Sequence, residues 1–284
     1  MEQDSDDSLR EAVRLWTLSD IEDVADTATS VVRRAQQTDG SLVALKILKP
    51  YGADEIVGAR LMQWWDGDGA ARIIGIEGRK ILMEWLDGPP LGDLVRNAGR
   101  DDEATAILCQ VAAKLHRQRH TAPCPLGPLA ASFGPLLDRG PDAWEPEHRP
   151  LVAKAAALAR ELLATTIEVV PLHGDFHHDN VVGGRLGWLA IDPKGLIGDR
   201  HYEFANVFRN PYGGGEIARD PRSIDARAAM IASRLGLDRR RLLQWAAAHC
   251  ALSECWNRAT GTKSEWNFLM MPLLLEAADR AQEA

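Results

Sequence analysis

The spacing of apolar and polar residues changes along the chain and separates a strand-rich part from a helical part. From Trp16 to Leu48 the pattern is β-like, and Asp39-Gly40 predicts a hairpin turn. The turn leads into Leu42–Leu48, a run that is apolar except for Lys46 and therefore predicts a buried strand. The same pattern predicts a weak or frayed helix at 1–12, a helix at 53–65 and strands at 71–77 and 80–86.

After the breaker Asp87-Gly-Pro-Pro90 the periodicity is that of helices over most of the remaining chain. Strands first and helices later predict an α+β, two-lobe arrangement. We expect a small, β-rich N-terminal lobe at 1–87 and a larger, mainly helical C-terminal lobe at 88–284. The expected helices are at 91–98, 101–119, 148–164, 201–209, 221–235, 239–259 and 265–283.

One stretch between these helices, residues 170–192, has a different pattern. A short apolar run leads into a polar loop, and a small hairpin with its turn at Gly183-Gly184 follows. This layout brings the side chains of Asp175, Asn180 and Asp192 close together. Oxygen donors that converge in this way suit Mg²⁺, and a carboxylate held beside the metal suits a general base. The stretch therefore predicts a phosphoryl-transfer site.

The charged residue of the predicted buried strand, Lys46, needs either water or an anion. Glu55 is its expected partner, because it lies off the apolar stripe that Ile56, Leu61 and Trp64 form on the next helix. In phosphoryl transfer a strand lysine of this kind neutralises phosphate charge. Lys46 and Glu55 therefore join the polar loop in one candidate site.

Charge and composition narrow the possible partners. The net charge of −8 and the pI near 5.5 argue against nucleic acid as the main partner and permit a cationic ligand. No apolar run approaches the roughly 20 residues that span a membrane, and the acidic start of the chain does not resemble a secretory signal. The four cysteines form no CxxC pair and are expected to be reduced. We therefore expect a cytoplasmic protein, monomeric or weakly dimeric, without a membrane or nucleic-acid partner.

Three segments carry a resemblance to a known family, namely His173–Asn180, Trp188–Asp199 and Phe204–Pro211. Together they resemble the aminoglycoside phosphotransferase family. Their Ile-Asp-Pro-x-Gly-Leu-x-Gly and Ala-Asn-x-x-x-x-Pro patterns are similar to its streptomycin 6-phosphotransferase and hydroxyurea phosphotransferase branch. The resemblance implies a protein-kinase-like fold. It also implies Mg²⁺-dependent transfer of phosphate from ATP, with GTP not excluded, to a hydroxyl of a small molecule.

The resemblance implies a role for each matched residue of the loop and the strand. Asp175 becomes the catalytic base, and Asn180 and Asp192 become the Mg²⁺ ligands. Lys46, paired to Glu55, contacts the α- and β-phosphates of the nucleotide. These roles supply the lysine, the base and the metal ligands that phosphoryl transfer requires.

Two further segments would hold the nucleotide. Backbone groups of Glu84, Trp85 and Leu86 would bind the adenine, and Thr27–Ser30 would be the nucleotide-covering loop. That loop contains no glycine, unlike the glycine-rich loop of protein kinases, so no residue in it is assigned as a ligand. Lys194 either offsets developing phosphoryl charge or faces solvent.

The acceptor site is predicted from polar residues that follow the metal-binding strand. One polar face of the helix expected there is formed by Asp199, Glu203, Asn206 and Asn210. It is either a solvated face or a binding surface. Glu254 adds a carboxylate on an otherwise apolar helix face, where either Arg258 or a cationic substrate satisfies it. The guanidinium groups of streptomycin would pair with carboxylates, so we expect a cationic acceptor in a pocket lined by Asp199, Glu203, Asn206 and Glu254.

Other functions compete with this one. The cluster of His173, Asp175, His177, His178 and Asp179 resembles a dense set of metal ligands and keeps a metal-dependent hydrolase in view. A nucleotide-binding pseudokinase is the second alternative, although base, metal ligands and lysine are all present. Within the kinase class, another aminoglycoside, hydroxyurea or an unrelated metabolite competes with streptomycin as acceptor, because fold does not decide substrate.

Overall fold

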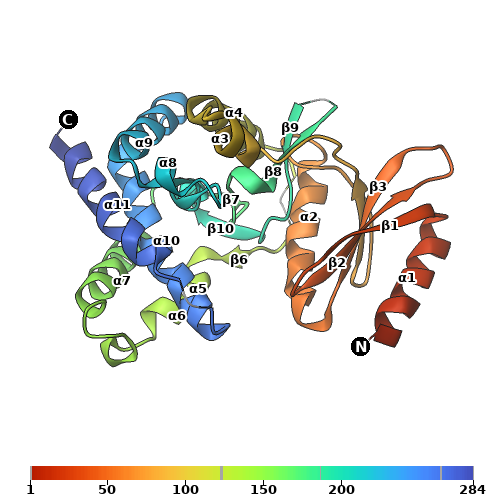
Figure 1. Cartoon of the computed structure of the whole chain (residues 1–284), viewed down its shortest axis with the longest axis horizontal. Coiled ribbons are helices and arrows are strands. Elements are labelled where there is room, and N and C mark those ends of the chain that lie inside the picture. Colours follow the sequence, from red (N-terminus) through yellow and green to blue (C-terminus); the bar gives the residue numbers. More distant parts are fainter. Residues whose placement is uncertain (1, 122–123, 186, 263, 284) are drawn as a thin grey trace.

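The computed structural model describes residues 2–121, 124–185, 187–262 and 264–283 (Figure 1). Its N-terminal part is built on a five-stranded antiparallel sheet with the strand order β1-β2-β3-β5-β4. The strands are β1 (Ser19–Asp26), β2 (Ser30–Gln36), β3 (Leu42–Leu48), β4 (Ile73–Glu77) and β5 (Lys80–Glu84). Gly40 has a φ of 85°, which glycine adopts without strain, so the β2–β3 hairpin turns where the sequence predicts it.

Both faces of strand β3 are covered by helices, which explains why its sequence is apolar on both sides (Figure 1). Leu45 belongs to the apolar cluster that α1 (Glu2–Trp16) covers, and Leu48 belongs to the cluster that α2 (Ile56–Trp65) covers. Since side chains alternate along a strand, Lys46 shares the α2 face with Leu48. The register of β3 therefore directs the lysine toward the start of α2, where Glu55 lies.

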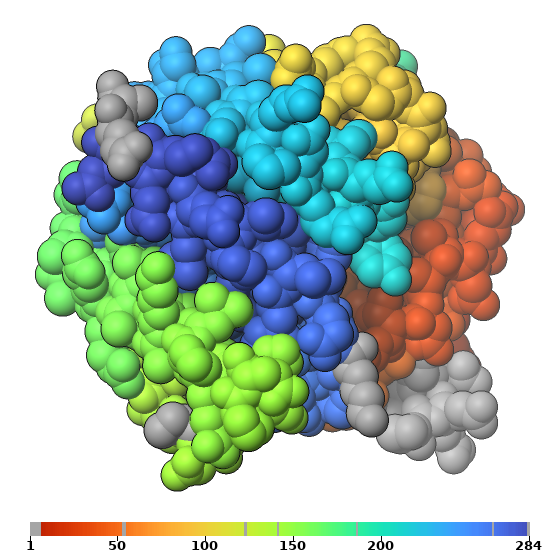
Figure 2. All heavy atoms as spheres, turned by 60° about the vertical axis from the view of Figure 1, so that its left-hand side comes forward, coloured from red at the N-terminus to blue at the C-terminus, as the bar shows by residue number. Residues whose placement is uncertain are grey.

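The C-terminal part is mainly helical, and α10 lies at its centre. Of the 21 residues of α10 (Arg239–Ala259), 14 are buried, and the helix packs against α7 (Arg149–Ala164), α9 (Pro221–Leu235) and α11 (Trp266–Glu283). Figure 2 shows the C-terminal elements, green to blue, on one side of the molecule and the red to orange N-terminal elements on the other. No helix in the described ranges is long and apolar enough to cross a membrane. The helices are α3 (Gly92–Ala98), α4 (Asp101–Leu115), α5 (Leu129–Ser132), α6 (Gly134–Leu137), α7 (Arg149–Ala164), α8 (Gly215–Arg219), α9 (Pro221–Leu235), α10 (Arg239–Ala259) and α11 (Trp266–Glu283).

Two small sheets carry the loop that the sequence singles out. The first has the strand order β6-β10-β7, and the second is the β8–β9 hairpin. Their strands are β6 (Gly127–Pro128), β7 (Val169–Leu172), β8 (Val181–Gly184), β9 (Gly187–Ala190) and β10 (Leu196–Asp199). The predicted hairpin is present, but its predicted turn is wrong, because Gly183 and Gly184 both pair with β9 and the chain turns after them.

The segment predicted as a helix at 201–209 forms two 3₁₀ turns instead, η4 (Arg200–Phe204) and η5 (Val207–Arg209). Side chains compete there for backbone groups that an α-helix would use. The Asp199 carboxylate accepts from the His201 N–H at 3.0 Å, and the Asn210 amide donates to the Asn206 carbonyl at 2.9 Å. The helix prediction is wrong at this point, whereas the predicted α+β, two-lobe class is confirmed.

Candidate active site

The polar loop after β7 is tied to the end of strand β9 by Asn180. Its Nδ2 donates to the carbonyl of Asp175 at 2.8 Å, and its own carbonyl accepts from the N–H of Ile191 at 2.9 Å. Asn180 thus connects the loop residue Asp175 to the segment that carries Asp192. Because the amide nitrogen is used in this contact, the amide oxygen is left as the free acceptor.

His173 makes a second connection between the same two segments. It is fully buried, and burial lowers its pKa, so the ring is neutral at neutral pH. Nε2 lies 2.8 Å from the Ile191 carbonyl, and Nδ1 lies 3.3 Å from the Asp175 N–H. A neutral ring that donates from Nε2 and accepts at Nδ1 satisfies both contacts. One side chain therefore fixes the backbone of Asp175 relative to the end of β9.

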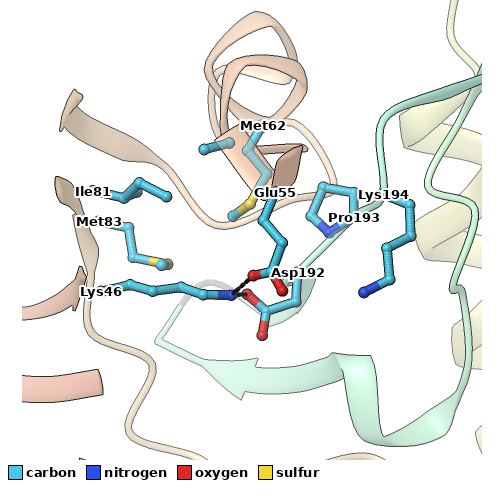
Figure 3. Close-up of a pocket in the computed structure, with 9 residues that line it drawn as sticks. Lys46, Glu55, Met62, Ile81, Met83, Asp192, Pro193 and Lys194 are labelled. Carbon is cyan, nitrogen blue, oxygen red and sulfur yellow. Dashed lines mark hydrogen bonds and ion pairs between the residues drawn. The ribbon is translucent and has the colours of Figure 1, made fainter. Parts of the chain in front are cut away.

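Lys46 meets two carboxylates that come from distant parts of the chain (Figure 3). Its Nζ lies 2.9 Å from Glu55 Oε2 and 2.9 Å from Asp192 Oδ1. Burial alone lowers the pKa of Lys46, but the two carboxylates outweigh it and the pKa is raised. Burial likewise raises the pKa of Glu55, but hydrogen bonds from Thr29 and Lys46 outweigh it and the pKa is lowered. Both groups stay charged, and the predicted pairing of Lys46 with Glu55 is present.

Asp192 has a φ of 57°, in the left-handed region that residues other than glycine seldom adopt. Such strain persists only where the surroundings hold the backbone. Here the N–H of Lys194 donates to the His173 carbonyl at 2.6 Å. From the other side Gly58 of α2 packs against Pro193, and a Cβ on Gly58 would lie 1.8 Å from the Pro193 carbonyl oxygen. Only glycine lets α2 approach the 192–194 segment this closely.

A pocket lies between β3, α2, β5 and the 192–194 segment (Figure 3). One wall is apolar and is formed by Ala59, Met62, Ile81 and Met83. The polar end is formed by Lys46, Glu55, Asp192 and Lys194, and Lys194 itself is exposed. An apolar wall beside a few convergent charged groups suits a nucleotide, with the base on the wall and the phosphates at the lysines.

The connector after β5 leaves one of the predicted adenine-binding N–H groups available. The N–H of Glu84 donates to the Arg72 carbonyl at 3.0 Å, and that of Trp85 donates to the Leu42 carbonyl at 3.3 Å. Within the described residues the N–H of Leu86 makes no such bond. Leu86 therefore holds the backbone donor that remains for a purine base.

The turn over Thr27–Ser30 is held by a hydroxyl. Thr27 Oγ1 accepts from the N–H of Ser30 at 3.0 Å and from that of Thr29 at 3.3 Å. The carbonyl of Thr29 accepts from the N–H of Lys49 at 2.8 Å, which ties the turn to the end of β3. This explains how the turn forms without a glycine at the position where protein kinases have a glycine-rich loop.

The oxygen donors of Asn180 and Asp192 fit Mg²⁺, and the histidines of the same loop do not form the site of a zinc hydrolase. Asn180 Oδ1 and the Asp192 carboxylate are hard oxygen donors, and a single oxygen of Asp192 is used by Lys46. His178 is buried, and His177 Nδ1 accepts from a backbone N–H of its own loop at 3.2 Å. In the part of the chain that the structure describes, no three His, Cys, Asp or Glu side chains are grouped closely enough to hold a metal.

The prediction that Asp199 lines an acceptor pocket is wrong. Its side chain is fully buried and accepts from Arg241 Nε at 2.8 Å and from His201 Nδ1 at 2.8 Å. Burial raises the pKa of Asp199, but the hydrogen bonds from His201 and Arg241 outweigh it and lower the pKa to about 2. Asp199 is an internal ion-pair partner and does not reach a substrate.

The prediction for Glu203 is wrong for the same reason. Its side chain is fully buried, and Oε1 accepts from the N–H of His173 and from His116 Nε2, both at 3.1 Å. Oε2 accepts from the N–H of Gly174 at 3.3 Å. Glu203 therefore holds the backbone of His173 and Gly174, at the start of the polar loop that carries Asp175.

Asn206 and Glu254 are also directed into the protein. Asn206 Nδ2 donates to Asp175 Oδ1 at 2.7 Å. Glu254 is buried, and its Oε2 accepts from the amides of Asn257 and Asn267 at 3.1 Å and 3.2 Å. Arg258, the alternative partner of Glu254, pairs with Glu145 instead. Neither a cationic acceptor nor Arg258 is therefore needed to satisfy Glu254.

Two residues of the site escape prediction from sequence. Gly58 leaves a signal, because a glycine inside a helical pattern costs about 1 kcal/mol relative to alanine and often marks a close approach. Arg209, whose Nε donates to Asn206 Oδ1 at 2.7 Å, leaves none, because an arginine in a polar segment is ordinary.

Comparison with known proteins gives a consistent result. A family model described as aminoglycoside/hydroxyurea antibiotic resistance kinase matches residues 15–261. Streptomycin 3''-kinase of Klebsiella pneumoniae is 45% identical over 209 residues, which are 72% of this chain and 76% of that protein. Streptomycin 6-kinase of Streptomyces griseus is 29% identical over 257 residues, 87% of this chain and 80% of that protein. The solved structure of aminoglycoside phosphotransferase APH(4)-Ia is similar in fold, with a TM-score of 0.66 at 15% identity. The match covers 98% of this chain and 98% of that chain.

Proposed function

Since the chain belongs to the aminoglycoside/hydroxyurea antibiotic resistance kinases, which are phosphotransferases, we propose that it transfers the γ-phosphoryl group of ATP to a hydroxyl of streptomycin, with Mg²⁺ as the metal. One observation carries the proposal. Asn180 and His173 tie Asp175 to the segment whose Asp192 pairs with Lys46. Lys46 and Asp192 line the polar end of an apolar-walled pocket, and these contacts connect the proposed base Asp175 and the proposed metal ligand Asn180 to that end.

Asp175 is the proposed base. Its Oδ1 accepts from Asn206, whereas Oδ2 makes no hydrogen bond to the described residues. Oδ2 is therefore the atom that would take the proton from the acceptor hydroxyl as its oxygen bonds to the γ-phosphorus, the bond from that phosphorus to the bridging oxygen breaks and ADP leaves. A positioned base contributes roughly 10²- to 10⁴-fold to such a rate.

The remaining residues would hold the nucleotide. Asn180 Oδ1 and Asp192 would bind Mg²⁺, which neutralises charge on the β- and γ-phosphates when it is bound. The Lys46 ammonium would donate hydrogen bonds to phosphate oxygens. Lys194 extends from the same segment as Asp192 and would supply a second positive charge (Figure 3). The N–H of Leu86 would donate to the adenine.

The identity of the acceptor is supported by the relatives. The motifs that follow Asp192 are similar to those of streptomycin 6-phosphotransferases, but the 45% identity to a streptomycin 3''-kinase exceeds the 29% identity to a streptomycin 6-kinase. We therefore infer the 3''-hydroxyl as the target. Hydroxyurea is the second candidate acceptor, because the matching family description includes it.

The test is turnover of purified protein with Mg-ATP or Mg-GTP against streptomycin, other aminoglycosides and hydroxyurea, followed by NMR to locate the phosphate. We expect streptomycin to be phosphorylated at the 3''-position with ATP, and Asp175→Asn to lower kcat by about 10²- to 10⁴-fold. Phosphorylation of hydroxyurea alone would select the second candidate. Turnover of no acceptor would overturn the proposal.

A further inference from the structure

A chain of hydrogen bonds runs from the Asp175 carboxylate into the interface between α10 and α11. Asn206 Nδ2 donates to Asp175 Oδ1 at 2.7 Å, and Asn206 Oδ1 accepts from Arg209 Nε at 2.7 Å. Arg209 Nη1 then donates to Ser253 Oγ at 2.7 Å and to Asn267 Oδ1. The candidate base is thus connected to two helices that form no part of the nucleotide pocket.

The orientation of each amide in this chain is fixed by its other partners. Asn206 Oδ1 accepts a second hydrogen bond from Asn210 Nδ2 at 3.0 Å, so the oxygen faces two donors and the nitrogen must face Asp175. Asn267 accepts from Arg209 and donates to Glu254 Oε2 at 3.2 Å. A flip of either amide would set donor against donor or acceptor against acceptor. Asn206 therefore presents a donor to the carboxylate in a single orientation.

Arg209 lies between two carboxylates and bonds to neither of them. Its side-chain partners in the described chain are the neutral groups of Asn206, Ser253 and Asn267. These three residues are buried, so the hydrogen bonds form at a low local dielectric and polarise one another. The order of charges along the chain is negative at Asp175, positive at Arg209 and negative at Glu254, which aligns the amide dipoles between them.

We propose that Asn206 and Arg209 position the Asp175 carboxylate for proton transfer, and that Glu254 acts through this network and not in the acceptor pocket. The proposal rests on the proposed role of Asp175 as base. In the described ranges Asn206 is the one side chain within hydrogen-bond distance of this carboxylate, since His177 Nε2 lies 3.9 Å from Oδ1. Fixing Oδ1 leaves Oδ2 directed at the acceptor, and a misplacement of about 1 Å costs up to about 10²-fold in rate.

Asn206→Asp tests the proposal with almost no change in shape. The new carboxylate still accepts from Arg209 and Asn210, but it presents an acceptor to Asp175. We expect kcat to fall about 10- to 100-fold with the KM for ATP unchanged, and the melting temperature to fall because two carboxylates then face each other. In an Asp175→Asn background the same substitution should change kcat by less than about 2-fold, because its effect passes through the removed carboxylate. An equal loss in both backgrounds would overturn the proposal.

Arg209→Lys and Asn257→Ala complete the experiment. Arg209→Lys keeps the charge without the planar fork and should lower kcat about 10-fold. Asn257 also donates to Glu254 but lies off the path to Asp175, so Asn257→Ala is the matched control and should stay within about 2-fold of wild type. Wild-type kcat in both Asn206→Asp and Arg209→Lys would overturn the proposal. The wild-type enzyme alone tests the proposed function, and the variants are compared with it on whichever acceptor it phosphorylates.

Discussion

Lys46 and Asp192 are 146 positions apart in the chain, yet the lysine Nζ lies 2.9 Å from Oδ1 of the aspartate. The contact joins strand β3 to the segment that follows β9. Glu55 approaches the same amine to 2.9 Å from the start of α2. The lysine is 7% exposed, so these two carboxylates compensate a charge that is largely removed from water. Removal of one member of such a group leaves the others uncompensated.

Lys46→Met leaves Glu55 and Asp192 close together without a cation. We expect the free energy of unfolding to fall by about 3 kcal/mol, as when one partner of a buried ion pair is removed. We also expect kcat/KM for ATP to fall about 10²-fold, because a phosphate loses a charge-assisted hydrogen bond worth about 1.5–3 kcal/mol. Urea unfolding and initial rates at varied ATP measure the two effects.

Lys80→Met is the matched control for that experiment. Lys80 lies on β5 of the same sheet and pairs with Glu11 at 2.9 Å, but the Glu11 side chain is 67% exposed. Surface pairs of this kind contribute about 0–1 kcal/mol, so both readouts should stay close to wild type. Equal effects of Lys46→Met and Lys80→Met would show that the pair with Asp192 has no special role.

Gly58→Ala should separate helix propensity from packing. In an exposed helix interior the change from glycine to alanine stabilises by about 0.5–1 kcal/mol. At Gly58 the new Cβ would lie 1.8 Å from the Pro193 carbonyl oxygen, so α2 or the 192–194 segment must move. We expect destabilisation by about 1–3 kcal/mol, as for overpacked cores, and a lower kcat/KM for ATP.

Gly134→Ala provides the control for Gly58→Ala. Apart from its two neighbours in the chain and the backbone of its own helix, a Cβ on Gly134 would come no closer than 3.5 Å to another atom, Asp138 Oδ2, which is ordinary contact. Thermal melting and ATP kinetics of the two variants should therefore differ. A Gly58→Ala protein as stable and active as Gly134→Ala would contradict the tight packing of α2 on Pro193.

The Lys46–Glu55 pair was predictable from sequence because local patterns decide it. The apolar run Leu42–Leu48 predicts a buried strand, and the single charge within it, Lys46, requires an anion nearby. Glu55 is available as that anion because it lies off the apolar stripe of the next helix. The spacing of Asp175 and Asn180 is also local, since a short loop of that length returns the Asn180 amide to the Asp175 carbonyl. The chemistry assigned to these residues stays a prediction.

The surroundings of Glu203 were not predictable in the same way. A helical period predicts its acceptor role, but the side chains of Asp199 and Asn210 hydrogen-bond to backbone groups, and 3₁₀ turns form in place of the helix. Glu203 contacts His116 and His173, which come from distant segments, so no spacing in the sequence predicts these contacts. Buried polar networks of this kind depend on tertiary packing that a single sequence does not specify.

Glu203→Gln tests the loop-supporting role of that residue. Glutamine has a single side-chain oxygen, so one of the N–H groups of His173 and Gly174 would face an NH₂ group. We expect a loss of about 1–3 kcal/mol of stability, the usual cost of an unsatisfied buried group. Displacement of Asp175 should lower kcat about 10-fold without raising the KM for the acceptor.

The KM for the acceptor in Glu203→Gln distinguishes a loop-supporting role of Glu203 from a role in an acceptor pocket. A raised KM for streptomycin with an unchanged kcat would return Glu203 to an acceptor pocket and contradict its buried position. Glu168→Gln is the control, because Glu168 is half exposed and pairs with Arg200 at 3.2 Å on the surface. Its kinetics and melting temperature should match those of the wild type.

Buried histidines should make stability depend on pH below neutrality. Burial lowers the pKa of His173 below its ordinary value of 6.5, and burial lowers that of His178 and His249 well below it. The unfolded chain then binds more protons than the folded one below pH 6.5. Their stabilising contribution is therefore complete above pH 6.5 and is lost as the pH falls toward the folded pKa.

His178→Phe isolates one of these groups. Within the described chain neither ring nitrogen of His178 has a hydrogen-bond partner, so the substitution removes a titrating group and no hydrogen bond. Between pH 6.5 and 5.5 the slope of unfolding free energy against pH should fall by up to about 1.4 kcal/mol per pH unit, since one proton fewer is taken up on unfolding. Urea unfolding at pH 7.5, 6.5 and 5.5 measures the slope. His120→Phe, at an exposed position, should leave it unchanged. A wild-type slope in His178→Phe would mean that His178 is already protonated in the folded protein, against its buried and unpartnered surroundings.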